Sequence, residues 1–313
     1  MLQSKSQLST NDIKSCKELL GSIRVGKITQ AQLLLDLNEI NLNIISKEHD
    51  KTPLMLACKK GYVSLVSEMI TNPKCNPLVE NSKGRNCFVY SVKYAHLEII
   101  KLLETYSRIK PIFKIRNNRI SDHFNINMLL LATLTSDSSI VKHFLNQHGD
   151  VIDPNEKDSY GNTPLLVSIK NSDVDMIRVL LLNSRVDVNL GNIYLDFMDT
   201  PLIFSIFQQN IVIFELLLGD IRTDPNKASE EGLTPLHYSI FLNNLSFVSI
   251  LLSHPHIDVN KVSLMGETPL RFALCKNDQE CVKLLISHQS IIIEHLSIEY
   301  DLLQRMSYMS CQN

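Results

Sequence analysis

The tripeptide Thr-Pro-Leu recurs through the chain and constrains its fold more than any other feature. Its copies begin at Thr52, Thr163, Thr200, Thr234 and Thr268. The last two steps are 34 residues each, and the step before them is 37. The Thr side chain can cap a helix N-terminus, and Pro fits the first helical position because its missing N–H would be unbonded there. A helix start repeated at this period predicts an array of similar units, each packed on its neighbours.

Other positions keep the same register where the tripeptide is lost. Asn86 and Asn127 stand in place of the Thr, and Asn is also a capping residue. A small residue follows five positions after each anchor, where a neighbouring helix must come close: Ala57, Ser91, Ala132, Ser168, Ser205, Ser239 and Ala273. Several units end in D-P-N or D-V-N, which are turn residues at the base of a hairpin. Near Glu231, Gly232 can take the positive φ of a tight turn.

A period near 33 residues with T-P-L-H, complete at Thr234 to His237, resembles the ankyrin repeat. The resemblance implies an all-α ankyrin-repeat solenoid of about eight helix-loop-helix-hairpin units, with a divergent N-terminal cap and a C-terminal capping helix. In that family the His of the motif bonds between repeats, so we expect His237 to be structural. Because one unit alone carries it, we expect polar bonding between repeats to be reduced and apolar packing to substitute for it.

The period also predicts the boundaries along the chain. We expect residues 1–12 to be disordered, residues 13–290 to form the repeat array, and residues 291–313 to form a capping helix and tail. Units are predicted to begin near residues 14, 49, 83, 124, 160, 197, 231 and 265. Two stretches break the period: a basic insertion at 105–125 and the segment 190–199. Insertions in repeat arrays usually map to loops on one face, often the binding face.

Composition restricts the class of protein further. The seven Cys include no C-x-x-C pair, and no apolar run approaches 18 residues. The first residues lack the apolar core of a secretion signal, so we expect a cytoplasmic, monomeric protein. The Asn-, Ile- and Lys-rich composition resembles proteins of protozoa and intracellular bacteria. Ankyrin proteins of such bacteria are often secreted into host cells, so the resemblance also implies an effector in the host cytoplasm.

Motifs that carry chemistry are missing from the sequence. It contains no G-x-G-x-x-G, phosphate-binding G-x-x-x-x-G-K, G-x-S-x-G or H-E-x-x-H pattern. His254 and His256 lie two apart, but no constellation of Cys and carboxylate residues surrounds them, which favours an exposed pair in a loop. Cys275 and Cys281 are six apart, which is not ordinary zinc spacing. We therefore expect no enzyme, no catalytic residues, no cofactor and no metal.

The resemblance implies a binding surface instead, on the concave face made by hairpin tips and first-helix residues. The positions expected there are Lys59, Lys60, Lys83, Arg85, Lys93, Tyr94, Phe124, Tyr160, Phe197, Phe207, Phe241, Leu242 and Met265. The side chains at these positions are basic in the second and third repeats and mainly aromatic or aliphatic in the later repeats. Residues 1–125 carry a net charge of +8 and the remainder −10. We expect a non-catalytic protein-interaction module, or scaffold, whose partner protein has an acidic part and an apolar part.

Two alternatives of other classes stay open. The insertion at 105–125 carries five cations that suit phosphate contacts, either with phosphoinositide headgroups or with nucleic acid. They are Arg108, Lys110, Lys114, Arg116 and Arg119. An interpretation of the same residues without a binding function is a solvated loop. The second alternative is a hydrolase that uses a Cys with one of the ten His residues as its base.

Overall fold

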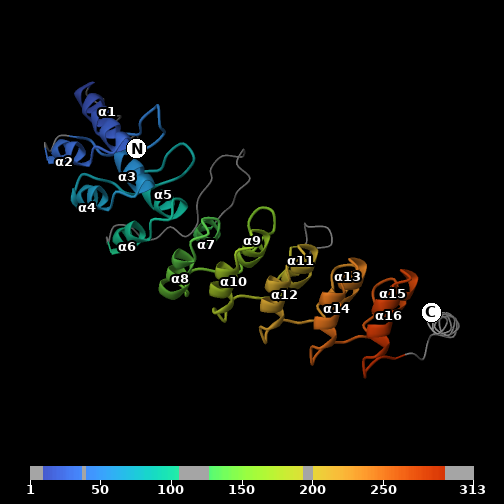
Figure 1. Ribbon diagram of the computed structural model, residues 1–313. Coiled ribbons are helices and arrows are strands. Elements are labelled where there is room, and N and C mark those ends of the chain that lie inside the picture. Colours follow the sequence, from blue (N-terminus) through green and yellow to red (C-terminus); the bar gives the residue numbers. More distant parts are fainter. Residues whose placement is uncertain (1–9, 37–39, 106–126, 193–199, 293–313) are drawn as a thin grey trace, which may run out of the picture. The chain divides into compact units, whose positions relative to one another are not determined.

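The computed structural model describes residues 10–36, 40–105, 127–192 and 200–292, in two compact units that divide between Ser159 and Tyr160 (Figure 1). Every regular element in these residues is a helix, and the helices form antiparallel pairs. Unit 1 contains α1 (Thr10–Val25), α2 (Ile28–Asp36), α3 (Pro53–Lys60), α4 (Val63–Thr71), α5 (Cys87–Lys93), α6 (Leu97–Thr105), α7 (Met128–Thr133) and α8 (Ser138–Gln147). Unit 2 contains α9 (Pro164–Lys170), α10 (Val174–Leu181), α11 (Pro201–Phe207), α12 (Ile211–Leu218), α13 (Pro235–Phe241), α14 (Leu245–Leu252), α15 (Pro269–Cys275) and α16 (Gln279–Ile286).

The first helix of each pair stacks on the first helix of the next pair. In unit 1 this row is α1, α3, α5 and α7, and in unit 2 it is α9, α11, α13 and α15 (Figure 1). The sixteen helices of the described residues thus make eight helix pairs, as the period predicts. Helix α1 begins at Thr10, three residues before the array was expected to start. The expected C-terminal capping helix and the basic insertion lie mainly outside the described residues.

The anchor residues cap their helices as predicted. From the second pair onward, each first helix begins directly after its anchor, and the anchor side chain accepts a hydrogen bond from the backbone N–H three residues on. The donor–acceptor distances run from 2.7 to 3.4 Å. The small residue five positions after each anchor is fully buried. A larger side chain there would separate the stacked helices, which explains why only Ala and Ser occupy it.

Asparagine clamps join consecutive repeats at the base of the hairpins. The Asn226 side chain donates from Nδ2 to the His256 carbonyl (2.6 Å), and its Oδ1 accepts from the Asp258 N–H (2.8 Å). The same pair of bonds, to a carbonyl and to the N–H two residues later, is also made by Asn43, Asn189 and Asn260. Each of these Asn residues therefore fixes the next hairpin through both ends of one amide.

These clamps add polar bonds to the one that the T-P-L-H motif implies. The single histidine of that motif indicated reduced polar bonding between repeats, and the Asn side chains, three of them in D-x-N turns, supply further bonds of this kind. The Asp of the turn acts within its own hairpin, where Asp224 Oδ1 accepts from Asn226 N–H at 2.8 Å and so holds the Asn in place. His237 makes the expected link as well, because its Nε2 lies 3.1 Å from the Glu267 carbonyl of the next hairpin.

We predict that Asn226→Ala lowers the free energy of unfolding of unit 2 by about 1–3 kcal/mol. The substitution removes two hydrogen bonds between repeats, each contributing on the order of 1 kcal/mol. Urea unfolding followed by circular dichroism measures the effect. Asn171→Ala, at an exposed helix end of the same unit, is the matched control. Equal midpoints for Asn226→Ala and the control would contradict a stabilising role for the clamps.

We also predict that His237 makes unit 2 less stable in mild acid. Its Nδ1 accepts from the Thr234 N–H (3.1 Å), so Nε2 carries the proton donated to Glu267, and the buried ring is neutral. Burial lowers the pKa of His237 from 6.5 to about 4. The unfolded chain therefore takes up the proton first as pH falls. The contribution of the neutral His237 ring to the free energy of unfolding is fully present above pH 6.5. It is lost progressively as the pH falls toward 4, by up to about 3 kcal/mol.

His237→Leu tests this linkage, because Leu occupies the equivalent position at Leu166. Unfolding midpoints are measured between pH 4 and 7 for both proteins. The wild type should show the steeper loss, since the other titrating groups are common to both. Parallel pH profiles would show that His237 does not control the acid sensitivity.

Candidate functional site

An apolar groove of about 620 Å³ lies in unit 2 against three consecutive first helices. Helices α11, α13 and α15 contribute four aromatic side chains: Phe207 and Phe241 at the last position of their helices, and Tyr238 and Phe272 in the middle of theirs. The two loops that precede α13 and α15 contribute the rest of the lining: Glu231, Leu233, Ser263, Leu264, Met265 and Glu267. The groove is thus made by first-helix residues and hairpin tips, which are the two kinds of position expected to form the binding surface.

Helix periodicity gathers the aromatic side chains on one wall. Tyr238 and Phe241 are three residues apart on α13 and so lie on one face of that helix. The Tyr238 ring packs edge-on against Phe207 of the preceding repeat, with centroids 5.2 Å apart. Phe207 is half-buried by this contact, whereas Phe241 is 52% exposed. Lys276 also contacts Phe241. Its Nζ lies 5.0 Å from the ring centroid and donates a hydrogen bond to the Phe241 carbonyl.

A close contact between the two loops forms the opposite wall. The Leu264 N–H donates to the Glu231 carbonyl at 3.1 Å. Gly232 permits this approach for two reasons: its φ is +76°, and a Cβ on it would lie 2.6 Å from the Leu264 nitrogen. The contact leaves Leu264 and Met265 at the tip, 78% and 86% exposed. Exposed apolar side chains of this size next to an open groove are typical of an interaction surface.

Charge is unevenly placed around the groove. The acidic residues Glu231 and Glu267 belong to the loop wall, while Lys276 stands beside Phe241 at the helix wall. Residues 160–313 carry ten Lys and Arg against 17 Asp and Glu, a net charge of −7. The loop wall therefore attracts a positively charged group, and the floor of the groove favours an apolar one.

The structure brings together three of the predicted contact residues and separates others from them. Phe207, Phe241 and Met265 line the groove. Tyr160 is exposed and Leu242 is half-buried at the end of α13, but neither lines it. Phe124 and Phe197 lie outside the described residues, as do all five cations of the insertion. Tyr238 and Phe272 also line the groove but were not predicted from the sequence, although both stand four residues after an anchor, on the side that carries Phe207 and Phe241.

The predicted basic positions lie in unit 1, on α3, α5 and the loop before α5. Lys60, Lys83 and Lys93 are exposed, and Lys59 and Arg85 are half-buried. Lys59 Nζ lies over the Tyr94 ring, 5.2 Å from its centroid, so these two predicted residues do meet. Burial lowers the pKa of nearby Lys51, and the charge of Lys59 lowers it further. Several cations therefore share this part of the surface.

Most of the cysteines in the described residues are poorly suited to nucleophilic catalysis. Five are buried and Cys275 alone is exposed. Burial raises the pKa of Cys16 to about 11 and those of Cys75 and Cys281 to about 12, and it raises the pKa of Cys58 as well. Because the thiolate is the nucleophile, these thiols are inert near neutral pH.

In the described part of the chain, no helix has the length and apolar character needed to cross a bilayer.

Comparison with known proteins agrees with the helix pairs and their period. A family model described as ankyrin repeats (three copies) matches residues 19–111, 109–192, 129–227 and 202–295. These matches cover most of the sequence, and the chain belongs to the ankyrin-repeat family. Arrays of this family are typically protein–protein interaction modules and are generally non-catalytic.

One similar protein is the 26S proteasome non-ATPase regulatory subunit 10 of Dictyostelium discoideum. The two chains are 27% identical over 86 residues, which is 28% of this chain. The match spans 37% of the length of that relative.

We predict that Phe241→Ala leaves unit 2 folded, whereas Phe214→Ala destabilises it by about 3–5 kcal/mol. Phe241 is half exposed at the groove, but Phe214 on α12 is fully buried and packs against Phe247 at a centroid distance of 4.7 Å. Truncating a buried Phe leaves a cavity, and truncating an exposed one does not. Thermal melts of the two variants make the comparison. A large loss of stability in Phe241→Ala would place Phe241 in the core and remove it from any binding surface.

Proposed function

We propose that this chain is a non-catalytic binding module that holds a segment of a partner protein in the unit 2 groove. The observation that supports the proposal is the groove itself: four aromatic side chains from three consecutive repeats, next to exposed Leu264 and Met265. Membership of the ankyrin-repeat family supports a protein partner over other ligands. Ordinary core packing explains Phe207 and Tyr238 but leaves the exposed faces of Phe241 and Met265 without a role.

The chemistry of the walls defines the segment that fits. Its central residue is a large apolar side chain, since the floor is aromatic and the cavity of about 620 Å³ accommodates one or two such groups. Its neighbour is a Lys or Arg that approaches Glu231 and Glu267 on the loop wall. Lys276 beside Phe241 disfavours a second cation at the helix wall. Charge complementarity of this kind sets the orientation of the segment and speeds its association.

The exposed lysines of unit 1 suit an acidic partner segment. Lys60, Lys83 and Lys93 would contact acidic residues, while Lys59 is held by its contact with Tyr94. Such exposed contacts contribute mainly to the rate of association and weaken as salt rises. The apolar groove would supply most of the affinity, because binding energy concentrates in a few desolvated large side chains.

A selection of random displayed peptides on the full chain tests the proposal. We expect the retained peptides to pair a large apolar residue with an adjacent Lys or Arg. Phe241→Ala or Met265→Ala should weaken binding of a selected peptide by about 1–3 kcal/mol, mainly through faster dissociation. Glu231→Gln with Glu267→Gln should slow association at low salt.

Matched controls separate the groove from general surface effects. Ile221→Ala removes an almost fully exposed apolar side chain outside the groove, and Glu280→Gln removes an exposed carboxylate on α16. Neither control should alter binding. Peptides that are uniformly acidic, or that bind Phe241→Ala as tightly as the wild type, would refute the groove as the binding site.

A further inference from the structure

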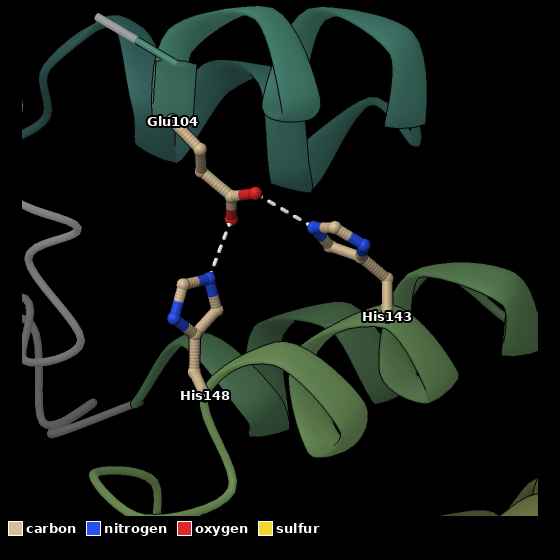
Figure 2. A group of neighbouring side chains, drawn as sticks. All are labelled: Glu104, His143 and His148. Carbon is tan, nitrogen blue, oxygen red and sulfur yellow. Dashed lines mark hydrogen bonds and ion pairs between the residues drawn. The ribbon is translucent and has the colours of Figure 1, made fainter.

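Two histidines converge on one carboxylate in unit 1. Glu104 lies in the last turn of α6, His143 lies on α8, and His148 is the residue that ends α8. Glu104 Oε2 is 2.7 Å from His143 Nε2, and Glu104 Oε1 is 2.9 Å from His148 Nε2 (Figure 2). The third and fourth repeats are thus joined by a three-residue cluster that belongs to neither the groove nor the basic surface.

The end of helix α8 is what brings the two imidazoles together. Residues five apart on a continuous α-helix point about 140° away from each other around its axis. The helix ends at Gln147, and His148 has left helical geometry with φ −128° and ψ 19°. Its ring can therefore turn back toward the side that carries His143. Fully buried Phe144 lies between them in sequence and contacts both rings, with centroid distances of 6.0 and 6.3 Å.

The surroundings preorganise the three polar groups. The side chains of Glu104 and His143 are each 13% exposed and that of His148 is 20% exposed. One ligand atom from each residue can be chosen so that all three lie within 4.8 Å of one another. The carboxylate accepts from both Nε2 atoms, so each ring presents its Nε2 to a common point. This convergence brings three metal-binding groups together at one place.

From this geometry we propose that Glu104, His143 and His148 form a binding site for a divalent transition-metal ion of the Zn²⁺ type. Two imidazole nitrogens and one carboxylate oxygen make a donor set that suits Zn²⁺, whereas Mg²⁺ and Ca²⁺ prefer oxygen ligands. A tetrahedral ion would take these three donors and one water. Metal bonds of about 2.0–2.2 Å need the carboxylate to move aside and the two imidazoles to close on the ion.

Metal binding changes the tautomers of both rings. Each neutral His that donates from Nε2 must place its proton on Nδ1 so that Nε2 becomes a ligand. No proton is released when both rings are already neutral. The bound ion then replaces two hydrogen bonds by three coordinate bonds across α6 and α8. Because the ion binds the folded arrangement, it stabilises this pair of repeats by mass action.

Titration of the chelator-treated full chain with Zn²⁺ or Co²⁺ tests the site. We expect binding by calorimetry, a raised melting temperature, and a visible Co²⁺ spectrum of a tetrahedral N/O site. His143→Gln and His148→Gln are the informative variants, because the Gln amide can still donate to Glu104 but is a poor transition-metal ligand. Each should weaken this binding by about tenfold or more while its circular dichroism is unchanged.

Further measurements distinguish a metal site from a purely hydrogen-bonded link. The double variant His254→Gln with His256→Gln removes the other close pair of imidazoles, whose centroids lie 5.9 Å apart, and should keep the Co²⁺ spectrum. Mg²⁺ should not raise the melting temperature of the wild type. The proposal is overturned if Zn²⁺ leaves that temperature unchanged, if Mg²⁺ acts equally, or if both Gln variants bind Co²⁺ like the wild type. Lower stability of the variants without any metal dependence would identify a hydrogen-bonded link alone.

Discussion

Hydrogen bonding from one repeat to the next is the interaction on which the rest of this structure depends. A single helix pair of this length cannot bury its apolar face alone, so each pair is folded only against its neighbours. Apolar packing between stacked helices supplies most of the stabilisation, but it is non-directional. The Asn clamps are directional: the amide of Asn189 fixes both Arg222 O and Asp224 N of the following hairpin. They set the register in which the helices stack.

The groove in unit 2 is a consequence of that register. Stacked first helices place equivalent positions side by side, so Phe207 and Phe241, 34 residues apart in sequence, line one surface. The hairpin tips then close the opposite side through the contact between Leu264 and Glu231. An array of this kind can change its ligand by substituting exposed side chains such as those of Phe241 and Met265, which contribute little to the stacking.

The Glu104 cluster shows a second use of the same architecture. Second helices of consecutive repeats also lie near each other, and polar residues at their ends can meet across the junction. Here the residues that come together carry two imidazoles and a carboxylate. These groups lie next to buried Phe144 and are themselves partly exposed to solvent. Whether such a cluster carries hydrogen bonds alone or also a metal ion alters how firmly neighbouring repeats are joined, without any change in the fold.

The sequence by itself determined the repeat and its local chemistry. The Thr and Asn anchors, the Pro at the first helical position and the buried small residue depend on contacts within one repeat or on a constant period, so they can be read from spacing. The sequence also indicated Phe207, Phe241 and Met265 as surface residues, but not Tyr238 and Phe272 beside them. Whether Tyr238 and Phe272 reach the surface depends on how much of each ring the next repeat covers, and the spacing of residues in the sequence does not reveal this.

The tertiary structure alone decided the remaining features. The D-x-N pattern predicted a turn, but not the bonds that Asn189, Asn226 and Asn260 make to the following hairpin. Glu104 stands 39 and 44 residues before its two His partners, across an insertion that breaks the period, so no spacing rule connects them. His148 meets His143 only because α8 ends between them. Contacts made across repeats at irregular positions follow from the path of the backbone, and that path is fixed only when the repeats have packed.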